Sequence, residues 1–384
     1  MDLQHTTHGK HRRRLGRRRL LLIGAGVVVL VGLFLTAVLW PRGTTSPDAS
    51  HRAGASAATA AHGSTSQRSA TSAPASLAAS TANPGVGASV AVGKKPHFIA
   101  VAPNGRFAYI ADAGAGAVYR FDTTKDAVTA TIPISQAPPQ MLTFSPDGRR
   151  AYVSAYTADF SVNFLVTLDA TTDTTVAALA VGKGPYSAAT TPDGRLLYLP
   201  YYDEEHLDVM DTKTGAMVAQ IPAAPCPHWI VFTRDGRFGY TTNHFSNVVT
   251  VLAIPQNTVV TTIPVGNGPH SLEMSPDGSR IAVVDYGGGD VQLIDPATNT
   301  VVSTVPSVGG GPQDVTFAPD GKHLYTANVN DGNVSVIDLS TGAITARIAT
   351  GASPTSVAVT PDGRRALVTN FDDGTVRVLD TAAG

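Results

Sequence analysis

The chain has 384 residues, of which 15% are charged, and it contains 37 glycines, 26 prolines and one cysteine. This composition predicts many short strands and tight turns in one large repeat fold, and the single cysteine excludes a disulfide framework within the chain. The formal net charge of −1 hides an asymmetry, because residues 89–384 hold 18 of the 28 Lys/Arg but 27 of the 29 Asp/Glu. An acidic domain is a poor general binder of nucleic acid, so no nucleic-acid partner is expected.

A basic tail, residues 1–19, precedes an uncharged apolar segment at residues 20–40. As a helix this segment spans roughly 32 Å, enough to cross a bilayer core. Six arginines lie before it and only Arg42 follows closely, so the positive-inside rule places the N-terminus in the cytoplasm. We therefore expect a single-pass signal-anchor in the cell membrane with the rest of the chain outside the cytoplasm. The alternative is a cleaved signal peptide and a secreted protein.

Residues 41–88 form a low-complexity segment, in which 38 of 48 residues are Ala, Ser, Thr, Pro or Gly. Such a composition buries too little apolar surface to fold by itself. It predicts a disordered linker between the membrane anchor and a folded domain at residues 89–384.

That domain is built from an internal repeat. A turn sequence of the Pro-Asp-Gly type recurs seven times, and its glycines, at 105, 148, 194, 236, 278, 321 and 363, are separated by 42 to 46 residues. This period holds four short strands and their turns, which is one blade of a β-propeller. The sixth unit shows them as Asp314–Ala318, His323–Asn328, Asn333–Asp338 and Ala343–Ile348.

The repeat resembles the YVTN-type β-propeller repeat of secreted and surface-layer-type proteins, a WD40-like arrangement. Its Tyr-x-x-Asn hallmark recurs as Tyr240–Asn243 and Tyr325–Asn328. The resemblance implies an all-β, seven-bladed propeller over residues 89–384. It implies little about function, because a propeller is a scaffold whose chemistry lies in its loops.

The two ends of the repeat predict how the ring closes. The seventh unit stops after its third strand, at Asp380, whereas residues 88–92 read as a fourth strand with no unit of their own. Pairing these segments would complete the last blade and leave no exposed edge.

Two sets of equivalent positions are expected at the top mouth of the central channel. We define the post-proline set as the residues that follow the proline of each inner strand: His97, Gln140, Tyr186, His228, His270, Gln313 and Thr355. The second-strand set ends each second strand: Asp112, Ala155, Tyr201, Asn243, Asp285, Asn328 and Asn370. Both sets vary from unit to unit, which is expected of a site rather than of a packing position.

From these sets we expect ligand-binding residues on units four and five, with the histidines partly exposed, and further candidates around the ring. The candidates are His228, Asn243, His244, His270, Asp285, His97, Tyr186 and Gln313. His228, His270 and Asp285 are the candidates for a divalent metal, although polar side chains that only line the mouth would explain them too. Glu273, which interrupts a set of small residues near His270, is a candidate general base, and His270 is the other candidate catalytic residue. The alternative is that Glu273 is a partner for a neighbouring backbone group or histidine.

The catalytic residues are not identified, because phosphate-binding loops, nucleophile elbows and HExxH motifs are absent from the sequence. A binding or interaction module is therefore the favoured function, with a protein, glycan or small molecule as ligand at the top face and no cofactor. Two alternatives stay open. One is a hydrolase, because seven-bladed propellers of this kind include lactonases, and the other is a metal-binding, redox-associated propeller.

Overall fold

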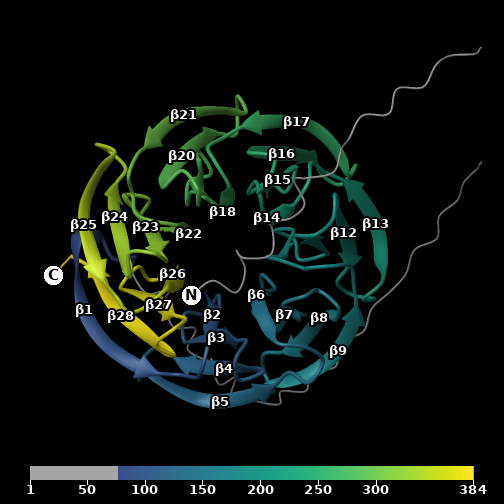
Figure 1. Cartoon of the computed structure of the whole chain (residues 1–384), viewed down its shortest axis with the longest axis horizontal. Helices are drawn as coiled ribbons and strands as arrows, with labels where there is room; N and C mark the ends of the chain where they lie inside the picture. The colour runs from purple at the N-terminus through teal and green to yellow at the C-terminus, as the bar shows by residue number, and fades with distance from the viewer. Residues whose placement is uncertain (1–76, 384) are drawn as a thin grey trace, which may run out of the picture. The chain divides into compact units, whose positions relative to one another are not determined.

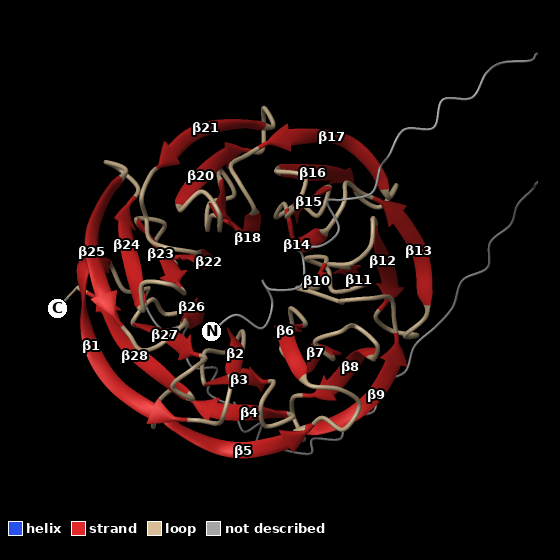
Figure 2. Cartoon of the chain, viewed as in Figure 1, coloured by secondary structure: helices blue, strands red, loops and turns tan. Residues whose placement is uncertain are grey.

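The computed structural model describes residues 77–383, which form seven four-stranded antiparallel sheets arranged as the blades of a propeller (Figure 1). All regular elements in this range are strands, as the colouring in Figure 2 shows. No helix in the described range could cross a membrane, and the anchor expected at residues 20–40 lies outside that range.

Each blade runs from an inner strand beside the central axis to an outer strand at the perimeter. The inner strands are β2 (Pro96–Val101), β6 (Pro139–Phe144), β10 (Ala189–Thr190), β14 (Pro227–Phe232), β18 (Pro269–Met274), β22 (Pro312–Phe317) and β26 (Pro354–Val359). The second strands are β3 (Phe107–Asp112), β7 (Arg150–Tyr156), β11 (Leu196–Pro200), β15 (Phe238–Asn243), β19 (Ile281–Asp285), β23 (His323–Asn328) and β27 (Arg365–Asn370).

The remaining strands complete the seven blades. The third strands are β4 (Ala117–Asp122), β8 (Asn163–Asp169), β12 (His206–Asp211), β16 (Val248–Ala253), β20 (Asp290–Asp295), β24 (Asn333–Asp338) and β28 (Thr375–Ala382). The outer strands are β5 (Ala127–Pro133), β9 (Thr174–Ala180), β13 (Met217–Pro222), β17 (Thr258–Pro264), β21 (Thr300–Val305), β25 (Ala343–Ala349) and β1 (Ser80–Ala91).

The ring closes through β1, which pairs antiparallel with β28 and so supplies the outer strand of blade seven. The strand begins at Ser80, inside the segment 41–88 that composition assigned to the linker. Its side chains are small, but the free edge of β28 offers a ladder of backbone partners, and Ser80 also donates from its hydroxyl to Asp320 Oδ1 at 2.8 Å. Backbone pairing can therefore order a segment whose composition alone does not favour a core.

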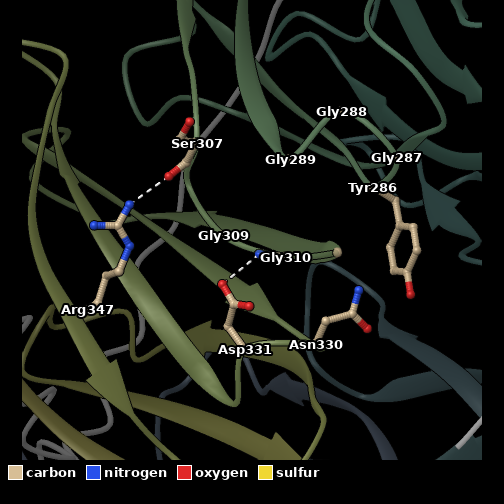
Figure 3. Close-up of a pocket in the computed structure, with 11 residues that line it drawn as sticks. Tyr286, Gly287, Gly288, Gly289, Ser307, Gly309, Gly310, Asn330, Asp331 and Arg347 are labelled. Atoms are coloured by element: carbon tan, nitrogen blue, oxygen red, sulfur yellow. Dashed lines mark hydrogen bonds between the residues drawn. The ribbon is translucent and has the colours of Figure 1, made fainter.

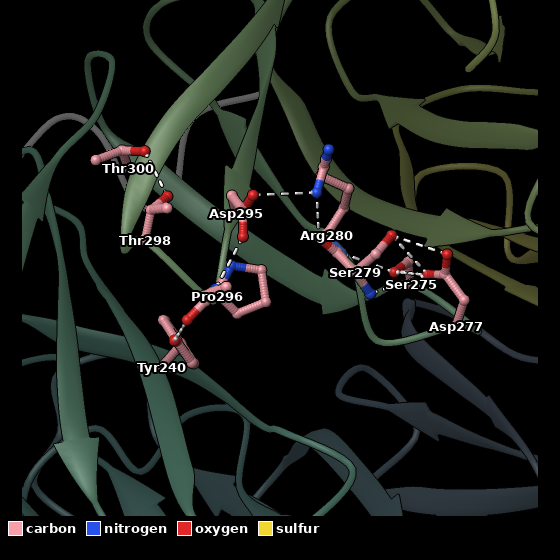
Figure 4. A network of polar contacts seen from close by, with 10 residues as sticks. Tyr240, Ser275, Asp277, Ser279, Arg280, Asp295, Pro296, Thr298 and Thr300 are labelled. Atoms are coloured by element: carbon pink, nitrogen blue, oxygen red, sulfur yellow. Dashed lines mark hydrogen bonds and ion pairs between the residues drawn. The ribbon is translucent and has the colours of Figure 1, made fainter.

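Neighbouring blades are joined at the bottom face by the tyrosine of the repeat motif. The hydroxyl of Tyr240 donates to Asn299 Oδ1 at 2.7 Å and lies 3.3 Å from the carbonyl of Pro296, both in the next blade (Figure 4). Tyr198 makes the same contact with Asn257 at 2.6 Å. Tyr198 and Tyr240 are thus fully buried while their hydroxyls bond across the blade boundary, whereas the buried hydroxyl of Tyr325, the equivalent residue of blade six, has no such partner in the described range.

A bulge near the top of the inner strands sets the direction of the post-proline set. In every blade except blade three, the pairing of the inner and second strands shifts register directly after the proline, as between Pro96 and Phe98. A bulge adds an unpaired residue and turns its side chain, so the residue after each proline is aimed at the axis. In blade three β10 is short, and Ser187 instead bridges to Trp229 of blade four.

Candidate functional site

The post-proline set forms a closed polar layer across the channel, rather than a ring around an open mouth. His97 Nδ1 lies 3.1 Å from Gln140 Oε1, and Gln313 Nε2 reaches His97 Nε2 at 3.3 Å. Thr355 donates to the carbonyl oxygen of His97 at 2.7 Å. Blades one, two, six and seven therefore meet near the axis.

His228 and His270 lie together within this layer, as expected for residues on adjacent blades. Their ring centroids are 4.2 Å apart, and the ring of His228 lies 3.6 Å from that of Tyr186. The expectation that both are partly exposed was wrong, since they are only 1% and 7% exposed. The cause is a cluster of aromatic side chains over the mouth, which a repeat alignment does not place in space.

Burial makes these imidazoles hard to protonate. It lowers the pKa of His97 to about 4 and that of His228 well below its ordinary value, with the charge of His270 adding to the effect at His228. A neutral imidazole can act as a metal ligand, but no group of three or more His, Cys, Asp or Glu within residues 77–383 is placed to hold a metal ion.

The second-strand set does not face the channel, which corrects the expected place of Asn243 and Asp285. Four of its members instead bind the loop that leads into the inner strand of their own blade, called here the leading loop: Asp112, Asn243, Asn328 and Asn370. Asn243 donates to the carbonyl of Ala224 at 2.6 Å, and Asn328 donates to that of Val308 at 3.3 Å. The Asn of the Tyr-x-x-Asn motif is thus a structural residue that satisfies a buried loop carbonyl.

Asp285 occupies the same position without such bonds. A side chain on Gly266 of the leading loop would lie 2.4 Å from Asp285 Oδ2, so the carboxylate packs against this loop, away from the histidine pair that was expected to share a metal with it. Burial, together with the charge of Asp290, raises the pKa of Asp285 to about 7.

Glu273 lies below the polar layer and bridges two blades. Its Oε2 accepts the backbone N–H of Phe317, in the next blade, at 2.5 Å. Burial raises the pKa of Glu273 to about 8. The contact agrees with the alternative that the sequence left open, a carboxylate that partners a neighbouring backbone group.

Asp314 is a buried acid that the sequence analysis did not single out. Its Oδ2 accepts from the hydroxyl of Ser356 at 2.8 Å and from the N–H of Val357 at 3.1 Å, and burial raises its pKa to about 6. The sequence contains an indication of this site, because Asp314 is the only charged residue at its position of the repeat. The equivalent residues in the other units are Phe98, Met141, Ser187, Trp229, Ser271 and Ser356.

The top face carries a second missed feature, an aromatic patch that we define as Tyr202, His244, Phe245 and Tyr286. Tyr202 and Phe245 lie 5.5 Å apart between ring centroids, and His244 and Phe245 lie 5.3 Å apart. Phe245 is 55% exposed. The repeat indicates this patch, because in five of the seven units an aromatic residue or histidine follows the member of the second-strand set. These residues are Tyr156, Tyr202, His244, Tyr286 and Phe371.

The patch stands directly on the polar layer. Tyr202 and His244 lie 5.4 and 5.3 Å from the ring of His228, and Tyr286 lies 5.9 Å from that of His270. Of the expected ligand-binding residues, His244 is therefore at the surface. His228, His270, His97 and Tyr186 form the buried floor beneath it, and Gln313 is half-buried in the same layer.

A groove of about 650 Å³ adjoins the patch at Tyr286, between blades five and six (Figure 3). Six glycines form much of its wall: Gly287, Gly288, Gly289, Gly309, Gly310 and Gly311. Asp331 accepts the N–H of Gly310 at 2.7 Å, and Arg347 donates to the carbonyl of Ser307 at 2.6 Å. The groove is consequently lined by backbone groups and a few polar side chains.

Two family models match parts of the chain. Residues 51–154 match the model described as "Lactonase, 7-bladed beta-propeller", and residues 281–383 match the "Cytochrome D1 heme domain". A search of the curated proteins matched none of them to this chain. A chain of the Kuenenia stuttgartiensis hydrazine synthase is similar in structure, with a TM-score of 0.69 and 22% identity over 76% of this chain and 97% of that chain.

These comparisons agree on architecture. Each family match covers less than half of the chain, and the structural likeness at 22% identity concerns the fold. The YVTN-type resemblance stays a prediction. The described part of the chain is thus a seven-bladed propeller, and the chain matches in part the model of the seven-bladed lactonase propeller and that of the cytochrome D1 heme domain.

Proposed function

We propose that this protein is a membrane-anchored binding module that holds its propeller outside the cytoplasm and docks a partner protein on the aromatic patch. The observation that carries the proposal is the patch itself, in which Phe245 is 55% exposed beside Tyr202 and His244. An exposed large aromatic with aromatic neighbours is typical of a protein interface, where Tyr, Trp and Phe supply most of the binding energy.

The floor beneath the patch supports this function. Buried rings of Tyr186, His228 and His270 contact one another and the patch, so the exposed rings are held in place before a partner arrives. A preorganised surface loses less conformational freedom on binding. The apolar segment 20–40 and the linker 41–88 support the anchored arrangement, because they would tether the propeller at the cell surface.

A protein is the ligand class that fits best because the patch is open. Small-molecule sites enclose most of their ligand, whereas Phe245 projects from the top loop of blade four. The propeller also has a net negative charge, which favours a partner with a neutral or basic contact surface.

Heme, the group named in one family model, does not fit the channel histidines. The ring of His228 lies 3.6 Å from Tyr186 and 4.2 Å from His270, so no macrocycle can enter between these rings. The lactonase alternative is less favoured because the half-buried Glu273 and the buried Asp314 already accept N–H groups from the next blade.

Cysteine labelling on intact cells tests both the location and the docking surface. Phe245→Cys and the matched control Val260→Cys, a 49% exposed position at the perimeter, would be treated with a membrane-impermeant maleimide that carries a photo-cross-linker. Background labelling should be low because the native Cys226 is buried. We expect both variants to be labelled and only Phe245→Cys to give a discrete adduct with another protein.

The outcomes separate the two parts of the proposal. If neither variant is labelled in intact cells but both are labelled after lysis, the propeller is not outside the membrane. If both are labelled and the adducts are absent or identical, the aromatic patch is not the docking surface.

A further inference from the structure

Asp285 and Asp290 form an unusual pair at the top of blade five. They lie at the end of β19 and the start of β20 and are direct cross-strand partners in the antiparallel register. Side chains at directly opposed positions lie on the same face about 5 Å apart, and like charges placed there are destabilising. A pairing of two carboxylates therefore needs a compensating group.

The equivalent pairs in blades six and seven supply that compensation within the pair. Asn328 donates from Nδ2 to Asn333 Oδ1 at 2.8 Å. Asn370 donates from Nδ2 to the hydroxyl of Thr375 at 3.1 Å. In blade five both positions are aspartate, so the donor is missing and two acceptors face each other.

Within residues 77–383, the protein does not replace the missing donor. Asp285 is fully buried, and neither its two carboxylate oxygens nor Asp290 Oδ1 has a hydrogen-bond partner there. The N–H of Gly266 in the leading loop lies beside Asp285, and its hydrogen bond goes to Gln292 Oε1 at 3.1 Å. No Lys, Arg or His of the described range forms an ion pair with either aspartate. Buried carboxylates without partners are strongly unfavourable.

The pair lies at the edge of the groove. Gly288 and Gly289 belong to the groove wall (Figure 3). A side chain on Gly288 would lie 2.3 Å from Asp290 Oδ1 and 3.3 Å from Asp285 Cβ, so this part of the wall packs against both aspartates.

We propose that Asp285 and Asp290 bind a hard divalent cation, Ca²⁺, at the edge of this groove. Three unpartnered carboxylate oxygens and the nearby Gln292 Oε1 give an all-oxygen donor set, and Ca²⁺ accepts such sets in flexible geometry with water and backbone carbonyls in the remaining positions. With two carboxylates, the expected affinity is that of extracellular modules, about 0.1–1 mM. The inference does not depend on the proposed docking function.

Calorimetric titration of the full-length, EDTA-treated protein with CaCl₂ at pH 7.5 tests the proposal. We expect one binding event and a melting temperature that rises with CaCl₂, with a weaker effect of MgCl₂. Asp290→Asn, which places an amide donor opposite Asp285 as Asn333 stands opposite Asn328 in blade six, should weaken Ca²⁺ binding by about tenfold or more because one of two carboxylate ligands is lost. Asp290→Ser, which introduces a hydroxyl as at Thr375, is a second variant in case the first does not fold.

Asp331→Asn is the matched control, because Asp331 is an exposed acid of the same groove. It should bind Ca²⁺ like the unaltered chain. The proposal is overturned if the unaltered protein gives no Ca²⁺ binding. Equal binding by a folded Asp290 variant also overturns it. The proposal is also overturned if the melting temperature responds to acid but not to Ca²⁺, because a proton shared by Asp285 and Asp290 would then stabilise the two carboxylates.

Discussion

The side chains that line the two halves of the central channel come from equivalent positions of the repeat, yet they stabilise the ring in different ways. In blades one, two and four large apolar side chains fill the axis: Phe98 and Trp229 meet edge to face at 5.4 Å beside Met141. In blades five to seven the equivalent residues are Ser271, Asp314 and Ser356, and each accepts a backbone N–H from the next blade.

In the polar half, side chains of one blade accept hydrogen bonds from the backbone of the next blade. Ser271 accepts from Val315 at 3.0 Å, and Asp314 accepts from Val357 at 3.1 Å. Each such hydrogen bond adds little to the free energy of unfolding, but a buried donor that is left without an acceptor lowers it strongly. The stability of the apolar half should therefore respond to lost side-chain volume, and that of the polar half to lost hydrogen-bond acceptors and to pH.

The largest effect is expected from Trp229→Ala in the apolar half. Removing this nearly buried ring loses its contacts across the axis and leaves a cavity, which costs about 3–5 kcal/mol of unfolding free energy. Urea denaturation of the full-length protein measures the loss. Phe245→Ala, at an exposed ring, should change stability by less than about 0.5 kcal/mol. Similar losses in both variants would show that the axis is not a packed core.

A smaller loss is expected from Asp314→Ala in the polar half. The substitution leaves the N–H of Val357 and the hydroxyl of Ser356 without their acceptor, which costs about 1–3 kcal/mol. Asp314→Asn keeps one acceptor oxygen and should lose less. The same denaturation assay applies. If Asp314→Ala leaves the free energy of unfolding unchanged while Asp314→Asn lowers it, the hydrogen bonds between blades do not stabilise the ring.

The smallest effect is a pH dependence that belongs to the polar half. The pKa of Glu273 is raised to about 8, so the folded protein binds its proton more tightly than the unfolded chain does. Its contribution to stability is full below the ordinary glutamate pKa and is lost as pH rises towards 8. Each tenfold increase in proton affinity on folding corresponds to about 1.4 kcal/mol of unfolding free energy. The partial exposure of Glu273 reduces the contribution that its raised pKa makes to this free energy.

Glu273→Gln should therefore flatten the fall in melting temperature between about pH 5 and pH 8, because glutamine keeps an acceptor for Phe317 without a charge. His97 and His228 act in the opposite direction, since their lowered pKa values remove stability as pH falls below the ordinary histidine range. An unchanged alkaline slope in Glu273→Gln would assign the pH dependence to other groups.

The architecture follows from the amino-acid sequence. A period of 42 to 46 residues and alternating apolar positions specify blades of four strands, because each blade must bury both faces against its neighbours. The unpaired third strand at the C-terminus also indicated the closing strand, although the strand begins at Ser80 because edge pairing, rather than composition, decides its length.

The tertiary structure alone decided what the candidate residues do. An alignment of units places His228 and Asn243 at the same end of a blade, but the bulge after each proline turns the histidine towards the axis, whereas Asn243 caps a loop carbonyl. Likewise, Asp112 and Asp285 are equivalent in sequence. Asp112 accepts three N–H groups of its neighbouring loops, whereas Asp285 faces Asp290 without a donor. Burial and hydrogen bonding depend on contacts between segments far apart in the chain, which the pattern of a single repeat does not contain.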